Sequence, residues 1–412
     1  MVRERGSPQL DSRYGSEPDQ LRRAPLSLRD PELRACVSQP FPTSCYFCIL
    51  GVATLNRQRI ERAATCCLRV RSEDFLFTPR QPNTAAVFVT MALVATVDGA
   101  RAGADGVQEA SRRSIGELKK TATLHLGKTA DWVAITPDAI WVGSTGPFAV
   151  HRIDPKTNRQ VAIVKLPGEP CAGLATGFGS LWVPLCGRTQ RLAKVDLKSN
   201  RLLNLFNVGT VTAEGGVTTS LDSVWIIVDT KGSLARVDPA SGTIRQTVRV
   251  PPGSYNPLYS DGQVWVTRAE GSEITAVDAR TSVISATVQT GPRPRFLTAG
   301  AGAVWALNQG DGSLTRVDIQ TRKVTKTVAL GTPGHGGDIS FAGDLVWTTV
   351  RKVPLSVVDG ASGTLLCQWK GPGGDSLGIG DGAIWLTDYE AGTISRIELD
   401  DALARCAPAS GH

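Results

Sequence analysis

A two-residue motif, an aliphatic residue followed by tryptophan, recurs along the last two thirds of the chain and limits the fold more than any other feature. Successive copies are 38 to 43 residues apart. A second motif, an aliphatic residue followed by an acidic one, comes after each tryptophan at a similar distance. The seven tryptophan copies are Ile140-Trp141, Leu181-Trp182, Val224-Trp225, Val264-Trp265, Val304-Trp305, Val346-Trp347 and Ile384-Trp385. A repeat of this length is typical of propellers and solenoids.

Within each repeat, apolar and polar residues alternate for five to seven positions and then stop at Gly, Pro, Asp or Ser. This pattern indicates short strands joined by tight turns. In the third repeat it predicts strands over 223–228, 233–237 and 243–250, with a turn at 238–242. Four strands per repeat and seven repeats predict an all-β fold, a seven-bladed β-propeller with four antiparallel strands in each blade.

Both repeated motifs have structural explanations. A large flat side chain at the same place in every blade fills the space between neighbouring sheets. An aspartate that opens a hairpin turn accepts hydrogen bonds from the backbone of its own turn. We therefore assign the tryptophans and the acidic residues to the fold, and we look for function in the loops.

The last repeat lacks one strand. Its strands are expected around 377–379, 383–387 and 393–399, and residues 400–404 have a helical pattern instead of a fourth strand. Residues 121–127 match the outer-strand pattern of the other repeats. We expect this N-terminal strand to complete the last blade, since closing the ring leaves no sheet edge open. The propeller is then predicted to span 121–406.

The N-terminal region contains none of the repeat motifs. A basic residue at Arg80, an apolar run over 85–97 and the Ala-x-Ala pattern at 100–102 are typical of a secretory signal peptide. The apolar run is too short for a transmembrane anchor. We expect 80–102 to be the signal segment and 103–120 a linker. Residues 1–79 would then be either non-native sequence from an upstream start or a disordered extension.

The charge of the propeller is only mildly basic. The whole chain carries a formal net charge of +7, and removing 1–102 leaves 31 basic and 28 acidic residues. Lysine and arginine do not form a stripe with interleaved aromatic residues, so nucleic-acid binding is not expected. We expect a monomer, located in the periplasm or secreted.

Four cysteines follow the signal segment, an even number that fits an oxidising compartment. If Phe178-Gly179 is a two-residue hairpin loop, residues whose numbers add to 357 face each other, which places Cys171 directly opposite Cys186. A disulfide is the favoured interpretation, and two buried free thiols are the alternative. Cys367 and Cys406 are predicted to form a second bridge that fastens the C-terminal tail.

The segment 382–397, with the sequence Gly-Ala-Ile-Trp-Leu-Thr-Asp-Tyr-Glu-Ala-Gly-Thr-Ile-Ser-Arg-Ile, is similar to the repeat of streptogramin (virginiamycin B) lyases. The whole of 121–400 resembles the bacterial propellers that include these lyases and the YVTN-repeat proteins. The resemblance implies seven blades and a metal-assisted elimination that opens a cyclic depsipeptide, with His and Glu residues at the mouth of the central funnel. His335 is the one histidine in a blade-opening loop.

Loops that open each blade, and those that follow each tryptophan strand, are expected to gather at one end of the axial channel. They carry polar residues of both signs, including Glu169, Glu214 and Arg351. One hypothesis makes Arg293 and Arg295 the partners of an anionic group. The predicted ligand-binding residues are Tyr255, Arg293, Arg295, Asp375 and Tyr389, and the predicted acid/base or metal set is His335, Asp338, Glu270 and Glu390.

Two functions follow from these loops. The first is a binding protein that recognises a protein, peptide or small molecule at the axial funnel and needs no cofactor. The second is a lyase or hydrolase acting on a cyclic ester or lactone, with Mg²⁺ and with His335 as the acid/base. The sequence does not determine whether any of these residues binds a metal, and it identifies neither the ligand nor the partner.

Overall fold

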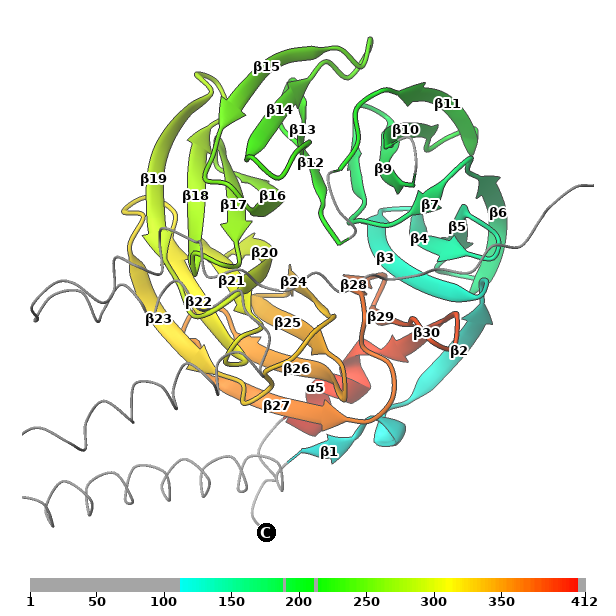
Figure 1. Ribbon diagram of the computed structural model, residues 1–412. Helices are drawn as coiled ribbons and strands as arrows, with labels where there is room; N and C mark the ends of the chain where they lie inside the picture. Colours follow the sequence, from blue (N-terminus) through cyan, green and yellow to red (C-terminus); the bar gives the residue numbers. More distant parts are fainter. Residues whose placement is uncertain (1–111, 188–189, 211–213, 407–412) are drawn as a thin grey trace, which may run out of the picture. The chain divides into compact units, whose positions relative to one another are not determined.

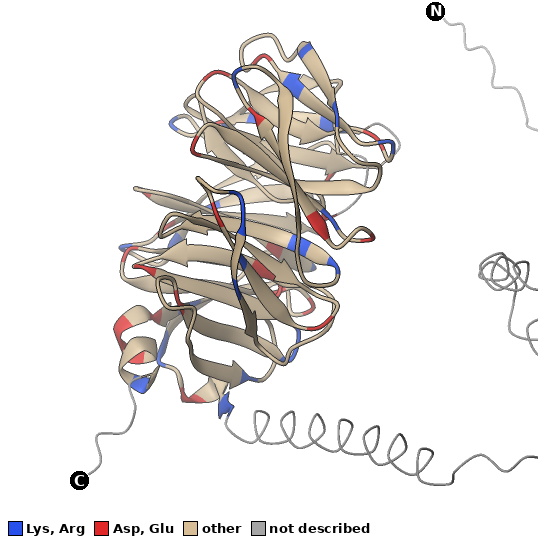
Figure 2. Cartoon of the chain, turned by 90° about the vertical axis from the view of Figure 1, so that its left-hand side faces the viewer, with Lys and Arg blue, Asp and Glu red and all other residues tan. Residues whose placement is uncertain are grey.

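The computed structural model describes residues 112–187, 190–210 and 214–406, which form a ring of seven β-sheets (Figure 1). Each blade is built on four antiparallel strands, although the inner strand of blade two is split in two and blade six carries one additional parallel strand. The predicted all-β, seven-bladed propeller is therefore confirmed. Figure 2 shows the ring from its side, with basic and acidic residues interspersed on the surface that it presents. In this part of the chain, no helix is both long and apolar enough to cross a membrane.

The blades follow the chain in order. Blade one consists of β3 (Thr129–Thr136), β4 (Ala139–Thr145), β5 (Ala149–Asp154) and β6 (Arg159–Lys165). Blade two consists of the short inner strands β7 (Glu169–Pro170) and β8 (Ala175–Gly177), then β9 (Ser180–Cys186), β10 (Arg191–Asp196) and β11 (Arg201–Phe206). Blade three consists of β12 (Val217–Thr219), β13 (Val224–Ile227), β14 (Ser233–Val237) and β15 (Ile244–Arg249).

The next two blades are regular and the last two receive strands from the N-terminal side. Blade four consists of β16 (Ser254–Ser260), β17 (Gln263–Arg268), β18 (Glu273–Asp278) and β19 (Val283–Gln289). Blade five consists of β20 (Pro294–Gly300), β21 (Ala303–Asn308), β22 (Ser313–Asp318) and β23 (Val324–Ala329). Blade six contains β24 (Asp338–Ala342), β25 (Leu345–Val350), β26 (Val353–Asp359) and β27 (Leu365–Lys370). Blade seven contains β28 (Leu377–Gly380), β29 (Ala383–Asp388) and β30 (Thr393–Glu398).

The tryptophans lie in the core between blades, as predicted. All seven are at most 1% exposed. Trp225 of blade three packs with Val264 and Val266 of blade four, and Trp305 of blade five packs with Val346 of blade six. Each tryptophan therefore joins its own blade to the following one, and the hydrophobic core is a ring of such contacts.

The acidic member of the second motif holds its turn together. One carboxylate oxygen of Asp238 accepts hydrogen bonds from the backbone N–H groups of Ala240 and Ser241, at 2.8 and 2.7 Å. The bond from Ser241 is the main cause of the lowered pKa of Asp238. Asp278 and Asp318 bind their own turns in the same way. The structural interpretation of this motif is confirmed.

The ring closes through its N-terminal strand. β2 (Lys120–His125) pairs antiparallel with β30, with Leu124 opposite Ile394 and His125 opposite Thr393. The predicted helical tail is α5 (Leu399–Cys406), which follows β30 directly. The expected source of the missing strand is therefore confirmed.

Residues just before β2 pack against blade six. β1 (Arg113–Ser114) runs parallel to β27, and the short 3₁₀ helix Ile115–Glu117 follows it. Arg112 is 9% exposed and donates hydrogen bonds to Gln368 and to the carbonyls of Leu330 and Gly331, at 3.2, 3.2 and 2.7 Å. The segment from 112 to 119, which the sequence analysis placed in a linker, thus contacts both blade six and the outer strand of blade five.

Both disulfides are present in the structure. The Cα atoms are 5.7 Å apart in Cys171–Cys186 and 5.2 Å apart in Cys367–Cys406. The first bridge is not directly cross-strand, so that detail of the prediction is wrong. The hairpin begins in the expected register, with Ala175 opposite Trp182, but by β7 the register has shifted and Glu169 lies opposite Cys186. The bridge therefore runs diagonally over an irregular stretch of inner strand.

We expect the Cys367–Cys406 bridge to stabilise the closed ring. Replacing both cysteines by alanine should lower the free energy of unfolding by about 4 kcal/mol, since the bridge closes a loop of 39 residues in the unfolded chain. Urea unfolding of the oxidised protein measures this change. The matched control is the Cys171→Ala/Cys186→Ala variant, whose loop of 15 residues should give about 3 kcal/mol. An unchanged midpoint for the first variant would contradict the prediction.

Candidate functional site

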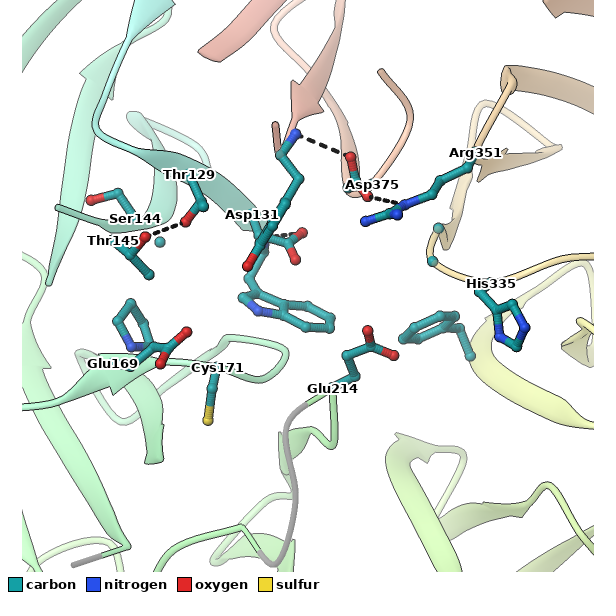
Figure 3. A pocket seen from close by; sticks show the side chains of 17 residues that line it. Thr129, Asp131, Ser144, Thr145, Glu169, Cys171, Glu214, His335, Arg351 and Asp375 are labelled. Atoms are coloured by element: carbon teal, nitrogen blue, oxygen red, sulfur yellow. Dashed lines mark hydrogen bonds and ion pairs between the residues drawn. The ribbon is translucent and has the colours of Figure 1, made fainter. Parts of the chain in front are cut away.

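A pocket of about 280 Å³ opens on the axis of the ring, at the end where the inner strands begin. Its walls come from the blade-opening loops and from the loops after the tryptophan strands, as the sequence analysis expected (Figure 3). The acidic and basic residues that line it are Asp131, Glu169, Glu214, His335, Arg351 and Asp375. We call this cavity the axial pocket.

The repeat explains why some of these side chains lie at the same level around the axis. In blades one and seven, the residue opposite the tryptophan is seven positions earlier, as in the pairs Ala134 with Trp141 and Gly378 with Trp385. Asp131 and Asp375 each lie three residues before that partner. Tyr255 and Arg295 occupy the equivalent position in blades four and five.

Irregular pairing at this position turns the side chains towards the axis. The register of the inner strand shifts between Asp131 and Val133, and Trp132 between them has a positive φ of 59°. Blade six has Gly337 at the equivalent position, where a Cβ atom would collide with the carbonyl of Thr349. The glycine leaves space in this wall of the pocket.

Two aromatic side chains form the floor. Trp132 and Phe296 are 7% and 5% exposed, and their ring centroids are 6.3 Å apart. Both residues also line a second cavity of about 370 Å³, further along the channel between the inner strands. Asp338 and Ser376 belong to that second cavity. The aromatic floor therefore lies between the axial pocket and the rest of the channel.

Two of the four carboxylates that line the axial pocket have an arginine partner. Glu214 forms an ion pair of 2.6 Å with Arg295, whose guanidinium group also donates to the hydroxyl of Tyr255 at 2.8 Å. The same guanidinium lies 3.8 Å from the centroid of the Tyr255 ring. Asp375 is 3.4 Å from Arg351 and accepts a backbone hydrogen bond from Tyr389 at 3.0 Å.

Asp131 and Glu169 have no such partner among the residues that the structure describes. Asp131 accepts a hydrogen bond from the backbone N–H of Trp132 at 2.8 Å. Burial raises the pKa of Asp131 well above its usual value, and the nearby carboxylates of Asp375, Asp338 and Glu214 raise it further. Burial also raises the pKa of Tyr389, with contributions from Glu169 and Asp131. This part of the pocket therefore presents two carboxylates that no arginine or lysine of the described structure neutralises.

The structure brings together only part of the predicted site. His335, Asp375 and Tyr389 line the axial pocket. Arg293 is not part of the lining, but one of its guanidinium nitrogens lies 3.3 Å from Nδ1 of His335. Arg295 and Tyr255 support the wall through Glu214.

The four residues proposed as a catalytic set are dispersed. His335 lines the axial pocket, but Asp338 lies in the second cavity beyond the floor. Glu390 lies 3.9 Å from Arg351 and lines a separate hollow, and Glu270 is exposed after β17. In the described part of the chain, no three His, Cys, Asp or Glu side chains are arranged to hold a metal ion. These residues therefore do not fit the Mg²⁺ site that the lyase resemblance implies.

Sequence reasoning missed Asp131, Trp132 and Phe296. The signal that could have found Asp131 is its spacing, since it precedes its tryptophan by ten residues, as Asp375, Tyr255 and Arg295 do. Trp132 and Phe296 each precede theirs by nine. A position-by-position alignment of the seven repeats would have shown both sets.

A serine and a histidine lie close together beside the pocket. The Oγ atom of Ser144 is 2.7 Å from Nε2 of His151, and Nδ1 of His151 is 2.6 Å from Oε1 of Gln160. Ser144 is 2% exposed, and its hydroxyl points away from the cavity (Figure 3). Burial lowers the pKa of His151. Because the hydroxyl is closed off from a ligand, we interpret this chain of hydrogen bonds as structural.

Asp338 connects three blades below the floor. Its carboxylate accepts hydrogen bonds from the backbone of Ile339 at 2.8 Å and from the hydroxyl of Ser376 at 2.7 Å. Ser376 in turn accepts a bond of 3.1 Å from the backbone of Val133. Burial raises the pKa of Asp338 to about 6.

Asp338 should make the stability of the protein depend on pH. Because its folded pKa lies above the unfolded value, its contribution is fully present below about pH 4 and is lost as the pH rises through about 6. The Asp338→Asn variant lacks this dependence. Its free energy of unfolding, relative to that of the native protein, should therefore rise by about 3 kcal/mol between about pH 4 and pH 8. Urea unfolding across this range measures the difference, with Asp344→Asn, an exposed turn residue, as the control. A difference that does not change with pH would contradict the assignment.

Comparison with known proteins supports the fold. No family model and no curated protein matches the sequence. Among solved structures, the chain is similar to the crystal structure of BamB from Moraxella catarrhalis, with a TM-score of 0.50 and 12% sequence identity. The match covers 68% of this chain and 99% of that one. At this identity the likeness shows the propeller fold alone, and the resemblance to the lyases stays a prediction.

Proposed function

We propose that this protein is an exported β-propeller that binds a small ligand, or the exposed end of a peptide or partner protein, in the axial pocket. The observation that carries the proposal is the pocket itself, which has a closed aromatic floor and charged walls fixed by ion pairs. Small-molecule sites are typically concave, with a few polar groups that converge on the ligand. Its volume of about 280 Å³ is suited to a small molecule or a chain end.

The disulfides support a location outside the cytoplasm. Two bridges are present in the described residues, and disulfides persist mainly in oxidising compartments. The signal-peptide-like segment 80–102 and the extension 1–79 lie outside the described residues. We therefore propose a periplasmic or secreted protein, which we expect to be a monomer.

Filling the axial pocket should abolish ligand binding. Glu169 lines the pocket and has no ion-pair partner in the described structure, so Glu169→Trp should occupy the cavity without leaving a buried charge unpaired. A library of small polar metabolites and short peptides is screened by thermal shift. A ligand at a hundred times its Kd should stabilise the native protein by about 2.7 kcal/mol and leave the variant unchanged.

The control for this screen is Asp344→Asn, on the turn between β24 and β25 at the other end of the inner strands. This variant should respond to ligands as the native protein does. Ligands that stabilise Glu169→Trp as strongly as the native protein would place binding elsewhere and overturn the proposal.

A lyase or hydrolase is the second candidate, and one observation favours it. His335 lines the axial pocket, where it could exchange a proton with a bound substrate. If it does, native protein should open a cyclic depsipeptide or a lactone, and His335→Ala should lower kcat at least a hundredfold. Mass spectrometry of the substrate detects the ring opening. Absence of turnover by the native protein, with and without Mg²⁺, would exclude this function for the compounds tested.

A further inference from the structure

The acidic and basic residues around the axial pocket that form no ion pair within the described structure lie towards opposite sides. Figure 3 shows Glu169 on one side, His335 and Arg351 on the other, and Asp131 between them. Arg293 adds a guanidinium group on the side of His335, from which it lies 3.3 Å away. We call Asp131 and Glu169 the acidic side, and Arg293 and His335 the basic side.

The ion pairs inside the protein leave both sides uncompensated. Arg295 neutralises Glu214, and Arg351 neutralises Asp375. Within the described residues, no lysine or arginine forms an ion pair with Asp131 or Glu169, and no carboxylate forms one with Arg293. A ligand with a cationic group and an anionic group could form ion pairs with the acidic side and the basic side at the same time.

Asp131 has the strongest need for a partner. It is half-buried against the aromatic floor, and among the described residues only the backbone of Trp132 donates a hydrogen bond to its carboxylate. Its raised pKa reflects the cost of holding a charged carboxylate there without a cation. An ammonium group donates three hydrogen bonds, so it could bind Asp131 and Glu169 together.

We propose that the axial pocket binds a zwitterion of the α-amino acid class, either a free amino acid or a short peptide. Its ammonium group lies against Asp131 and Glu169, and its carboxylate faces His335 and Arg293. The aromatic floor of Trp132 and Phe296 contacts the apolar part of the ligand. The inference rests on the proposed function and names its ligand class.

The lining favours a zwitterion over simpler ligands. A purely cationic amine would leave Arg293 and His335 without a role, and a purely anionic ligand would be repelled by Asp131 and Glu169. A metal ion needs a cluster of ligands that the described residues do not provide. The volume of about 280 Å³ limits the ligand to a small one.

Three dipeptide probes test the proposal by removing one charge at a time. Isothermal titration calorimetry at about pH 7, where the α-amino group is charged, compares L-alanyl-L-alanine with its N-acetyl form and with its C-terminal amide. Hydrogen bonds to charged groups contribute about 1.5–3 kcal/mol each, so each blocked probe should bind at least tenfold more weakly than the zwitterion. Free L-alanine is included in case the pocket accepts a single residue.

Two variants assign each charge to its side. Asp131→Asn keeps the acceptor for the backbone of Trp132 and removes the negative charge. This variant should bind alanyl-alanine about tenfold more weakly than the native protein does. Acetylation of the dipeptide should then lower its affinity for the variant little further. The double variant Arg293→Gln/His335→Asn should likewise bind alanyl-alanine and its C-terminal amide with nearly equal affinity. Asp344→Asn, the exposed control, should bind all probes as the native protein does.

Several results would overturn the zwitterion proposal. The first is that a blocked dipeptide binds as tightly as the zwitterion. The second is that both variants keep the native preference for a free ammonium and a free carboxylate group. The third is that neither alanine nor alanyl-alanine binds at millimolar concentration. If the library screen yields ligands that Glu169→Trp excludes and none carries both an ammonium and a carboxylate group, the pocket is the binding site but its ligand class is different. If no ligand depends on the pocket, the proposed function fails as well.

Discussion

The packing of one tryptophan against the next blade determines the geometry of everything else in this structure. Each indole is buried between two sheets and contacts the aliphatic residues of the following blade. Because the same contact recurs seven times, a given distance before each tryptophan corresponds to one level on the axis. Asp131, Tyr255, Arg295 and Asp375 share such a level, although up to 244 residues separate them in the sequence. A packing motif without chemistry of its own thus determines where the charged groups meet.

Closure of the ring determines which of these groups become neighbours. β2 supplies the outer strand of blade seven, which brings β3 of blade one beside β28. Asp131 therefore lies close enough to Asp375 for the Asp375 carboxylate to raise the pKa of Asp131, in addition to the larger effect of burial. The bridge between Cys367 and Cys406, together with the contacts of Arg112, attaches both ends of the propeller to blade six. The two ends of the propeller lie side by side at blades six and seven, where the ring closes (Figure 1).

Regular features of the fold could be predicted from the sequence, because each depends on a local pattern that recurs. The blade count, the closing strand at 120–125, the helix after Glu398 and the pairing of four cysteines all follow from such patterns. The exact register at Cys171 could not be predicted, because the inner strand of blade two is interrupted between β7 and β8. Asp338 was placed with His335 because both lie in one loop region, yet the aromatic floor lies between their cavities. The spacing before their tryptophans places Trp132 and Phe296 at one level, but the contact between their rings across the channel depends on the closed ring.

If the cavity above Trp132 and Phe296 is the binding site, its acidic and basic sides should orient the ligand. A crystal structure of the protein with L-alanyl-L-alanine would show this orientation. We expect the dipeptide on the aromatic floor, with its ammonium group within hydrogen-bonding distance of Asp131 and Glu169 and its carboxylate towards His335 and Arg293. A dipeptide bound in the reverse orientation, or bound outside the axial pocket while the pocket holds only solvent, would contradict this expectation.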